Sequence, residues 1–144
     1  MKQTLLVAVP LLLAGTGYMF WPASAPDARL TPVPDRAVTA LAEVAVPDAL
    51  STDARIGKLA FEAKCAACHG ANAAGQDGIA PPLVHVIYEP GHHGDESFQR
   101  AAAQGVRAHH WRFGNMPPVE GVTRSDVKMI ISYVRELQRA NGIH

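Results

Sequence analysis

The chain has 144 residues, with 13 basic and 13 acidic side chains, and its formal charge at neutral pH is zero. The charges are scattered singly and form no basic block, which argues against a nucleic-acid partner. The length suits one domain with an appendage at one end. We divide the chain into an export segment at residues 1–25, a linker at residues 26–50 and a domain at residues 51–144.

The amino-terminal segment has the pattern of an export signal, because Lys2 is followed by an apolar stretch without charge up to Asp27. Two interpretations remain open. Residues 23–25, Ala-Ser-Ala, resemble a signal-peptide cleavage site, but the following Pro26 disfavours cleavage there. The stretch also approaches the ~20 residues that span a bilayer, and aromatic residues at 18–21 suit a membrane interface. We favour an uncleaved anchor on the periplasmic side of the inner membrane, with a soluble periplasmic protein as the alternative.

The linker at residues 26–50 is rich in alanine and proline, with prolines at positions 26, 32, 34 and 47. It has no sustained hydrophobic periodicity, so we predict a semi-extended tether. A long tether is useful to an anchored domain, which is one reason to favour the anchor.

Two helices are predicted in the first part of the domain. One spans about residues 53–65, and its predicted apolar face carries Ile56, Leu59, Ala60 and Ala63. The other spans about residues 95–104, with Asp95 as its N-cap and Gly105 as its stop. Its apolar stripe is formed by Phe98, Ala101 and Ala102.

The clearest helix is predicted at the carboxyl end of the chain. Thr123 is its N-cap, Asp126 follows three residues later, and Gly142 ends it. Its apolar positions recur at helical spacing: Val127, Ile130, Ile131, Val134 and Leu137. No segment alternates convincingly like a strand, so we predict an all-α domain with long loops.

The strongest motif is C-x-x-C-H at Cys65, Cys68 and His69, which is the attachment site of c-type haem. The two thiols add to the two vinyl groups of the porphyrin, and the histidine is the proximal ligand of the iron. A redox disulfide or half of a zinc site would use the same pair of thiols. A zinc site needs a second cysteine pair, which is absent from the sequence, and a thioredoxin-like fold needs β-α-β patterning, which we do not find. We therefore predict one covalent haem c.

Residues 52–142 resemble a class I monohaem cytochrome c, and four features carry the resemblance. They are C-x-x-C-H near the end of the first helix, Gly57 with Phe61 one turn later, residues 80–83 (Ala-Pro-Pro-Leu), and residues 115–118 (Asn-Met-Pro-Pro). The family has glycine where this chain has Ala80, and residues 84–94 and 106–114 depart from the family pattern.

The resemblance implies a small helical domain wrapped around one haem. It implies that the Pro81 carbonyl accepts the second N–H of His69, and that Met116 is the sixth ligand of the iron. It also implies that Gly57 admits the last helix at close range, where Tyr133 is the candidate aromatic partner. Methionine ligation raises the reduction potential. Met129, in the last helix, is interpreted as core.

Seven histidines are many for this length, and five of them lie in or beside the two loops that depart from the family pattern: His85, His92, His93, His109 and His110. The simplest interpretation places them on the surface or against the haem. Two alternatives remain: one of them replaces Met116 on the iron, or the two pairs bind a second metal such as copper or zinc. Nearby, Arg107, Trp111 and Arg112 are candidate hydrogen-bond donors to the haem propionates.

The function that follows is single-electron transfer between protein redox partners, a donor and an acceptor that we expect to be membrane-associated. An autonomous enzyme is not predicted, because the sequence has no second catalytic constellation. The alternatives are a haem subunit of a larger periplasmic oxidoreductase and a gas-binding or peroxidase-like module, which would require an open position on the iron.

Overall fold

The structure is a computed structural model of the chain, and it describes residues 39–144. Its four α-helices are α1 (Thr52–Lys64), α2 (Ala66–His69), α3 (Asp95–Gln104) and α4 (Arg124–Ala140). Two short 3-10 helices follow α2, at Ala71–Ala73 and Val86–Tyr88. Within the described residues β-structure is limited to two isolated bridges, Gln76 with Ala80 and Val106 with Met116. The prediction of an all-α domain is therefore confirmed. The predicted export segment and most of the linker lie outside the described residues.

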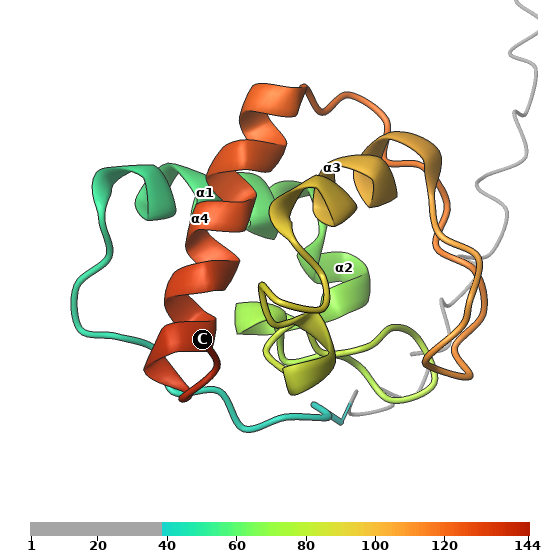
Figure 1. Cartoon of the computed structure of the whole chain (residues 1–144), viewed down its shortest axis with the longest axis horizontal. Helices are drawn as coiled ribbons and strands as arrows, with labels where there is room; N and C mark the ends of the chain where they lie inside the picture. Colours follow the sequence, from blue (N-terminus) through green and yellow to red (C-terminus); the bar gives the residue numbers. More distant parts are fainter. Residues whose placement is uncertain (1–38) are drawn as a thin grey trace, which may run out of the picture. The chain divides into compact units, whose positions relative to one another are not determined.

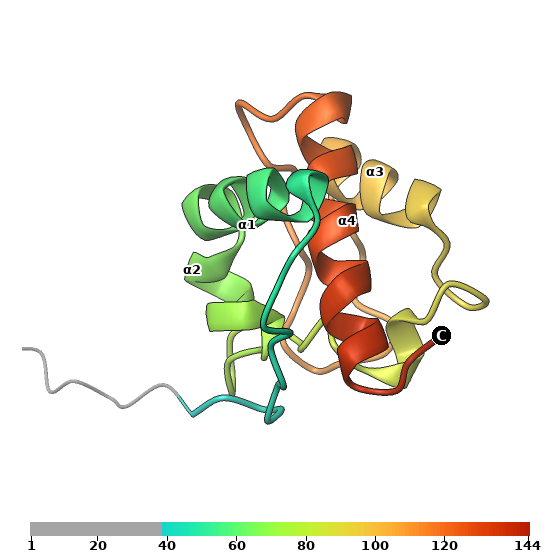
Figure 2. The same ribbon diagram turned by 90° about the vertical axis from the view of Figure 1, so that its left-hand side faces the viewer.

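The central feature of the fold is the packing of α4 between α1 and α3 (Figures 1 and 2). Gly57 on α1 lies against the α4 backbone so closely that an added Cβ would be 1.8 Å from the Met129 carbonyl oxygen. One turn further along α1, the Phe61 ring packs against Tyr133 with centroids 5.8 Å apart. The glycine therefore admits the backbone of α4, and Tyr133 packs on Phe61, one turn further along α1.

The buried face of α1 differs from the predicted one. Ala54, Gly57 and Phe61 are buried, whereas Ile56 and Leu59 are 51% and 69% exposed. The prediction assumed that the face with the largest apolar side chains is buried. The close approach of α4 to Gly57 instead determines which face of α1 packs against α4.

The N-cap of helix α3 lies one residue before the predicted cap, Asp95. Gly94 is the N-cap, and Asp95 is the first helical residue, whose carboxylate accepts a hydrogen bond from Arg135 Nε at 3.0 Å. The predicted end at Gly105 is confirmed; this residue has a φ of +75° and its N–H donates to the Ala101 carbonyl. A left-handed conformation of this kind favours glycine.

Helix α4 begins as predicted. Thr123 Oγ1 accepts from the Asp126 N–H, and the Asp126 carboxylate accepts from the Thr123 N–H, which is a complete capping box. All five predicted apolar positions of α4 are buried. Three further positions on the same helix are also buried: Tyr133, Arg135 and Gln138.

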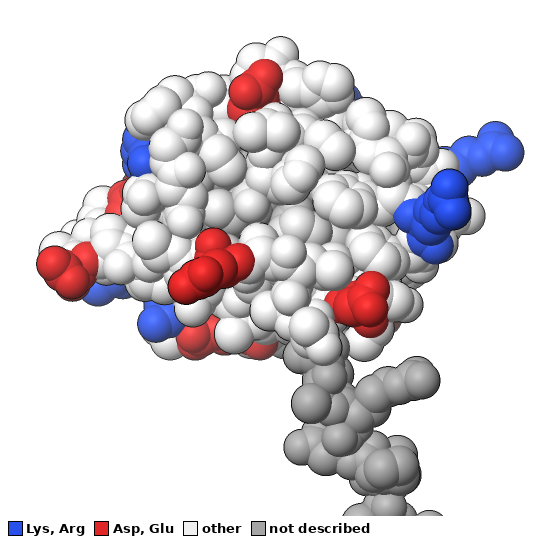
Figure 3. All heavy atoms as spheres, turned by 90° about the horizontal axis from the view of Figure 1, so that it is seen from below, with Lys and Arg blue, Asp and Glu red and all other residues white. Residues whose placement is uncertain are grey.

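The described end of the predicted linker, residues 39–50, lies along the domain. The Asn141 side chain makes two hydrogen bonds to the backbone of Ala45. Asn141 Nδ2 donates to the Ala45 carbonyl at 2.8 Å, and the Ala45 N–H donates to Asn141 Oδ1 at 2.9 Å. Val44 and Leu50 pack against the core. This part of the chain is therefore a peripheral strap on the domain. Viewed from below, the molecule shows scattered acidic side chains and a few basic ones at its edge (Figure 3).

Candidate functional site

The C-x-x-C-H motif begins at Cys65, the single residue between α1 and α2, and its other four residues form α2. Helix α1 ends at Lys64, and the His69 N–H donates to the Cys65 carbonyl at 2.9 Å, so the five residues make one compact helical turn. Cys65 is half-buried, Cys68 is exposed, and both thiols are free. Burial first, and then the neighbouring Cys68, raise the pKa of the Cys65 thiol to about 11. Both sulfurs line one large cavity.

His69 is oriented by the backbone of Pro81. The ring is 8% exposed, and its Nδ1 lies 2.9 Å from the Pro81 carbonyl oxygen. A carbonyl only accepts, so Nδ1 carries the proton and Nε2 keeps its lone pair for a metal. Burial lowers the pKa of His69, and the hydrogen bond to Pro81 acts in the opposite direction. The imidazole is therefore held in its neutral, ligating form.

Ala80 fits the turn where the family has glycine. The turn is closed by hydrogen bonds between Gln76 and Ala80, from the Gln76 N–H to the Ala80 carbonyl at 2.9 Å and from the Ala80 N–H to the Gln76 carbonyl at 3.1 Å. Its positive φ falls on Gly78, at +74°, and Ala80 is not among the described residues with positive φ. A side chain at position 80 therefore carries no conformational cost, and the hydrogen bond at Pro81 is kept.

Met116 lies on a different segment of the same cavity wall. Its N–H and carbonyl both pair with the backbone of Val106 at 2.9 Å, which closes the loop between them. In Figure 1 this loop follows α3, and its outgoing and returning segments lie side by side. Gly105 packs against the Met116 carbonyl, because an added Cβ would be 2.4 Å from that oxygen. Met116 is half-buried and is positioned by its backbone.

The cavity that joins these residues has a volume of about 990 Å³. This size lies at the upper end of the range for small-molecule and cofactor sites. Cys65, Cys68, His69, Pro81 and Met116 all line it. The structure therefore brings the three residues of the motif, Pro81 and Met116 to one cavity.

A buried donor on this cavity indicates what kind of ligand it takes. Trp111 Nε1 is buried and has no hydrogen-bond partner among the described residues. Burial raises the pKa of Tyr88, and the nearby indole N–H of Trp111 acts in the opposite direction. The N–H and the Tyr88 hydroxyl nevertheless do not reach hydrogen-bond geometry. An orphaned donor costs about 1–3 kcal/mol, and a ligand with acceptor oxygens would remove that cost. The residues present therefore fit a haem with its carboxylates.

The two predicted arginines of this region are both exposed, unlike Trp111. Arg107 lines the cavity, and its carbonyl lies 2.8 Å from His109 Nδ1. Arg112 is not on the cavity wall. Trp111 is thus the better placed donor for a carboxylate.

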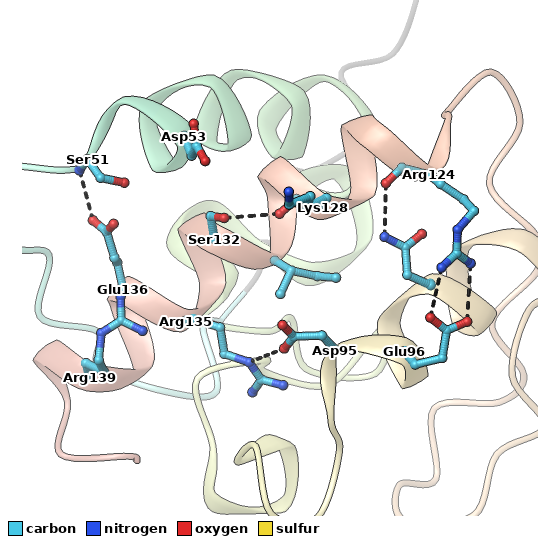
Figure 4. A pocket seen from close by; sticks show the side chains of 12 residues that line it. Ser51, Asp53, Asp95, Glu96, Arg124, Lys128, Ser132, Arg135, Glu136 and Arg139 are labelled. Carbon is cyan, nitrogen blue, oxygen red and sulfur yellow. Dashed lines mark hydrogen bonds and ion pairs between the residues drawn. The ribbon is translucent and has the colours of Figure 1, made fainter.

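A second hollow, of about 430 Å³, lies between α3, α4 and the start of α1 (Figure 4). Its lining has no cysteine, histidine or methionine. Four of its charged groups form two ion pairs: Arg124 with Glu96 at 2.9 Å, and Arg135 with Asp95 at 3.0 Å. This hollow is a polar seam between helices and has no ligands for a haem.

The histidine pairs converge. His92, His93, His109 and His110 all line the haem-sized cavity, and His85 packs edge-on to Trp111 with centroids 5.2 Å apart. The His110 pKa is lowered, first by desolvation and then by repulsion from His109, His93 and His92. These imidazoles form one group at the cavity wall.

Buried polar residues on α4 were not predicted. Arg135 Nη1 donates to the Tyr88 carbonyl and to Gln138 Oε1, both at 2.7 Å, and Arg135 Nη2 donates to the His93 carbonyl at 2.6 Å. Gln138 Nε2 donates to the Leu83 carbonyl at 2.8 Å. Position 135 lies one turn after Ile131, and position 138 one turn after Val134, so the helical period itself was the available signal.

Comparison with known proteins gives one match. The family model described as Cytochrome c matches residues 54–138, which is more than half of the chain. No curated protein and no solved structure matches. Among the residues that the structure describes, no helix is long and apolar enough to cross a membrane.

Proposed function

Because this chain belongs to the cytochrome c family, whose members bind haem c covalently and transfer electrons, we propose that it is an exported single-electron carrier with His69 and Met116 on the iron. The observation that carries the ligand assignment is that both residues line one cavity, His69 on the α2 side and Met116 on the loop after α3. No further residue is needed to fill the two axial positions.

Each residue has a separate role in this proposal. Cys65 and Cys68 hold the haem through thioether bonds, which also removes the Cys65 thiol that burial keeps protonated. Pro81 fixes the ring of His69 and raises its donor strength. The indole N–H of Trp111 is the candidate donor to a haem carboxylate. The haem iron supplies the electron chemistry by changing its oxidation state by one.

Methionine ligation has two consequences for function. Thioether ligation raises the reduction potential of the iron, which suits acceptance of electrons from a quinol-linked donor. With His69 and Met116 both bound to the iron, no position on it would be open to a substrate. This supports a carrier over a gas-binding or peroxidase-like module.

The test compares optical spectra of the holo-protein in both oxidation states for the wild type, Met116→Ala and the control Met129→Ala. Met129 lies on α4 and is not on the cavity wall. We expect the weak long-wavelength band of a ferric iron–thioether bond in the wild type and in the control, and its loss in Met116→Ala. If the wild type lacks the band, or Met116→Ala keeps it, the ligand assignment is wrong. Rapid carbon monoxide binding to the reduced wild type would then favour the sensor or peroxidase alternative.

Export and anchoring form a separate part of the proposal, supported by Lys2 and the uncharged apolar stretch that follows it. The test is intact-mass analysis of the haem-containing chain after cell fractionation. A full-length chain in the membrane fraction supports the anchor, and a chain that begins at Pro26 in the periplasm supports cleavage. Holo-protein confined to the cytoplasm would contradict export. Donor and acceptor proteins at the same membrane are expected in the anchored case.

A further inference from the structure

Three imidazole rings from two separate loops meet on the wall of the haem cavity. His92 and His93 lie in the turn before α3, and His110 lies in the loop between Val106 and Met116. The His92 ring is 4.7 Å from His93 and 5.3 Å from His110, and His93 is 5.2 Å from His110, centroid to centroid. One ligating nitrogen from each ring lies within 4.8 Å of the other two.

We propose that His92, His93 and His110 form a binding site for a divalent transition-metal cation, separate from the iron. A metal that holds imidazole nitrogens at about 2.0–2.1 Å places two of them roughly 3.4 Å apart in a tetrahedral site. The three nitrogens lie within 4.8 Å of one another, so they are at most about 1.4 Å more widely spaced than a bound ion requires. Rotation of exposed side chains covers that difference, since His92 and His110 are both exposed.

His93 is already oriented as a ligand. Its Nδ1 lies 2.6 Å from the Ile87 carbonyl oxygen, so Nδ1 carries the proton and Nε2 is left with a lone pair. Its N–H donates to the Glu89 carbonyl at 2.8 Å, and its own carbonyl accepts from Arg135. A backbone carbonyl behind a ligating histidine is the usual outer partner in metal sites.

The loop that carries His110 is held at both ends. The Val106–Met116 pair closes its base, and the Ala108 N–H donates to Asn115 Oδ1 at 2.9 Å. Within the loop, His109 Nδ1 lies 2.8 Å from the Arg107 carbonyl, and the His109 ring is 4.2 Å from His110. His110 is therefore presented toward the turn of His92 and His93 by a structured loop.

The donor set indicates the class of metal. Three neutral imidazoles, without thiolate or carboxylate, suit Cu²⁺, Zn²⁺ or Ni²⁺ better than Mg²⁺ or Ca²⁺, and Cu²⁺ has the highest affinity for nitrogen ligands. The crowding that disfavours protonation of His110 also favours the neutral form that metals bind. The site lies on the wall of the haem cavity and does not depend on Met116 as a ligand.

The experiment titrates Zn²⁺, as a redox-inactive probe, into chelator-treated holo-protein by isothermal calorimetry. Wild type is compared with His92→Ala, His93→Ala and His110→Ala, and with His144→Ala as a control, because His144 is an exposed histidine outside the cluster. We expect one Zn²⁺ per wild-type chain, an affinity at least about tenfold lower in each of the three cluster variants, and an unchanged affinity in the control.

The haem spectrum of every variant is recorded alongside the titration. An unchanged spectrum shows that the variant is folded, and His110→Ala, on an exposed loop, tests the proposal even if His93→Ala is unstable. The proposal is overturned if the wild type binds no Zn²⁺, or if the cluster variants bind it as well as the wild type does.

Discussion

Gly57 and the Met129 carbonyl are in contact across the α1–α4 crossing, with no room for a side chain between them. In Gly57→Ala the new Cβ would stand 1.8 Å from that oxygen, so the two helices must separate. Overpacking of this kind costs about 1–3 kcal/mol, which exceeds the gain in helix propensity. We expect a lower free energy of unfolding for the holo-protein, measured with denaturant. Gly91→Ala is the control, because its Cβ would meet only Glu89 Oε1 at 4.0 Å; an equal loss in both variants would contradict the explanation.

Gly105→Ala is expected to disturb Met116. The new Cβ would lie 2.4 Å from the Met116 carbonyl, and the φ of +75° disfavours alanine. Gly142→Ala also places alanine at a positive φ, of +77°, but with no atom within 4 Å of the added Cβ. We expect the thioether band and the reduction potential to fall only in Gly105→Ala. Equal spectra for the two variants would show that the Met116 loop tolerates displacement.

Arg135→Met is expected to destabilise the domain by about 2–4 kcal/mol. Arg135 is 7% exposed and joins α4 to Asp95, to the Tyr88 and His93 carbonyls and to Gln138. Methionine keeps the length of the stem but leaves these acceptors without their donor. Arg139→Met, one turn later and exposed, is the control for loss of charge on α4. Matching denaturation midpoints for the two variants would argue against the network.

Asp126→Asn is expected to make stability less dependent on acidic pH. The Asp126 pKa is lowered from 3.8, chiefly by hydrogen bonds from the Thr123 N–H and hydroxyl. The folded-state pKa thus lies below the unfolded value, so the contribution is fully present above about pH 4 and is lost as the pH falls through the folded value. Urea midpoints should differ between wild type and variant at pH 7, begin to converge as the pH falls below about 3.8, and meet only below the folded-state pKa. A constant difference at every pH would exclude this carboxylate as the cause.

Much of this architecture could be predicted because its signals are local. The α4 period, the Thr123–Asp126 box and the C-x-x-C-H turn depend on residues within a few positions of one another, and the structure has all three. The family resemblance added the two distant elements, Pro81 and Met116, and both lie on the wall of the cavity.

The parts that could not be predicted depend on how distant segments approach. Ile56 and Leu59 are more apolar than Ala54 and Gly57, so hydrophobicity alone favours the wrong face of α1. The contact between His110 and His92 could not be predicted, because their two loops have no periodic sequence pattern. The core beneath the loops determines where they lie. The helical period can indicate that position 135 is buried, but it does not indicate that the Arg135 guanidinium has four hydrogen-bond partners there.

The packing of α4 on α1 has a consequence for the order in which this molecule is made. A growing chain presents the thiols of Cys65 and Cys68 long before Arg124–Ala140 has been synthesised. Until that last helix arrives, Gly57 and Phe61 lack their contacts with Met129 and Tyr133. Covalent attachment of the haem would therefore not have to wait for the core to close, because the carboxyl-terminal helix is the last element to reach it.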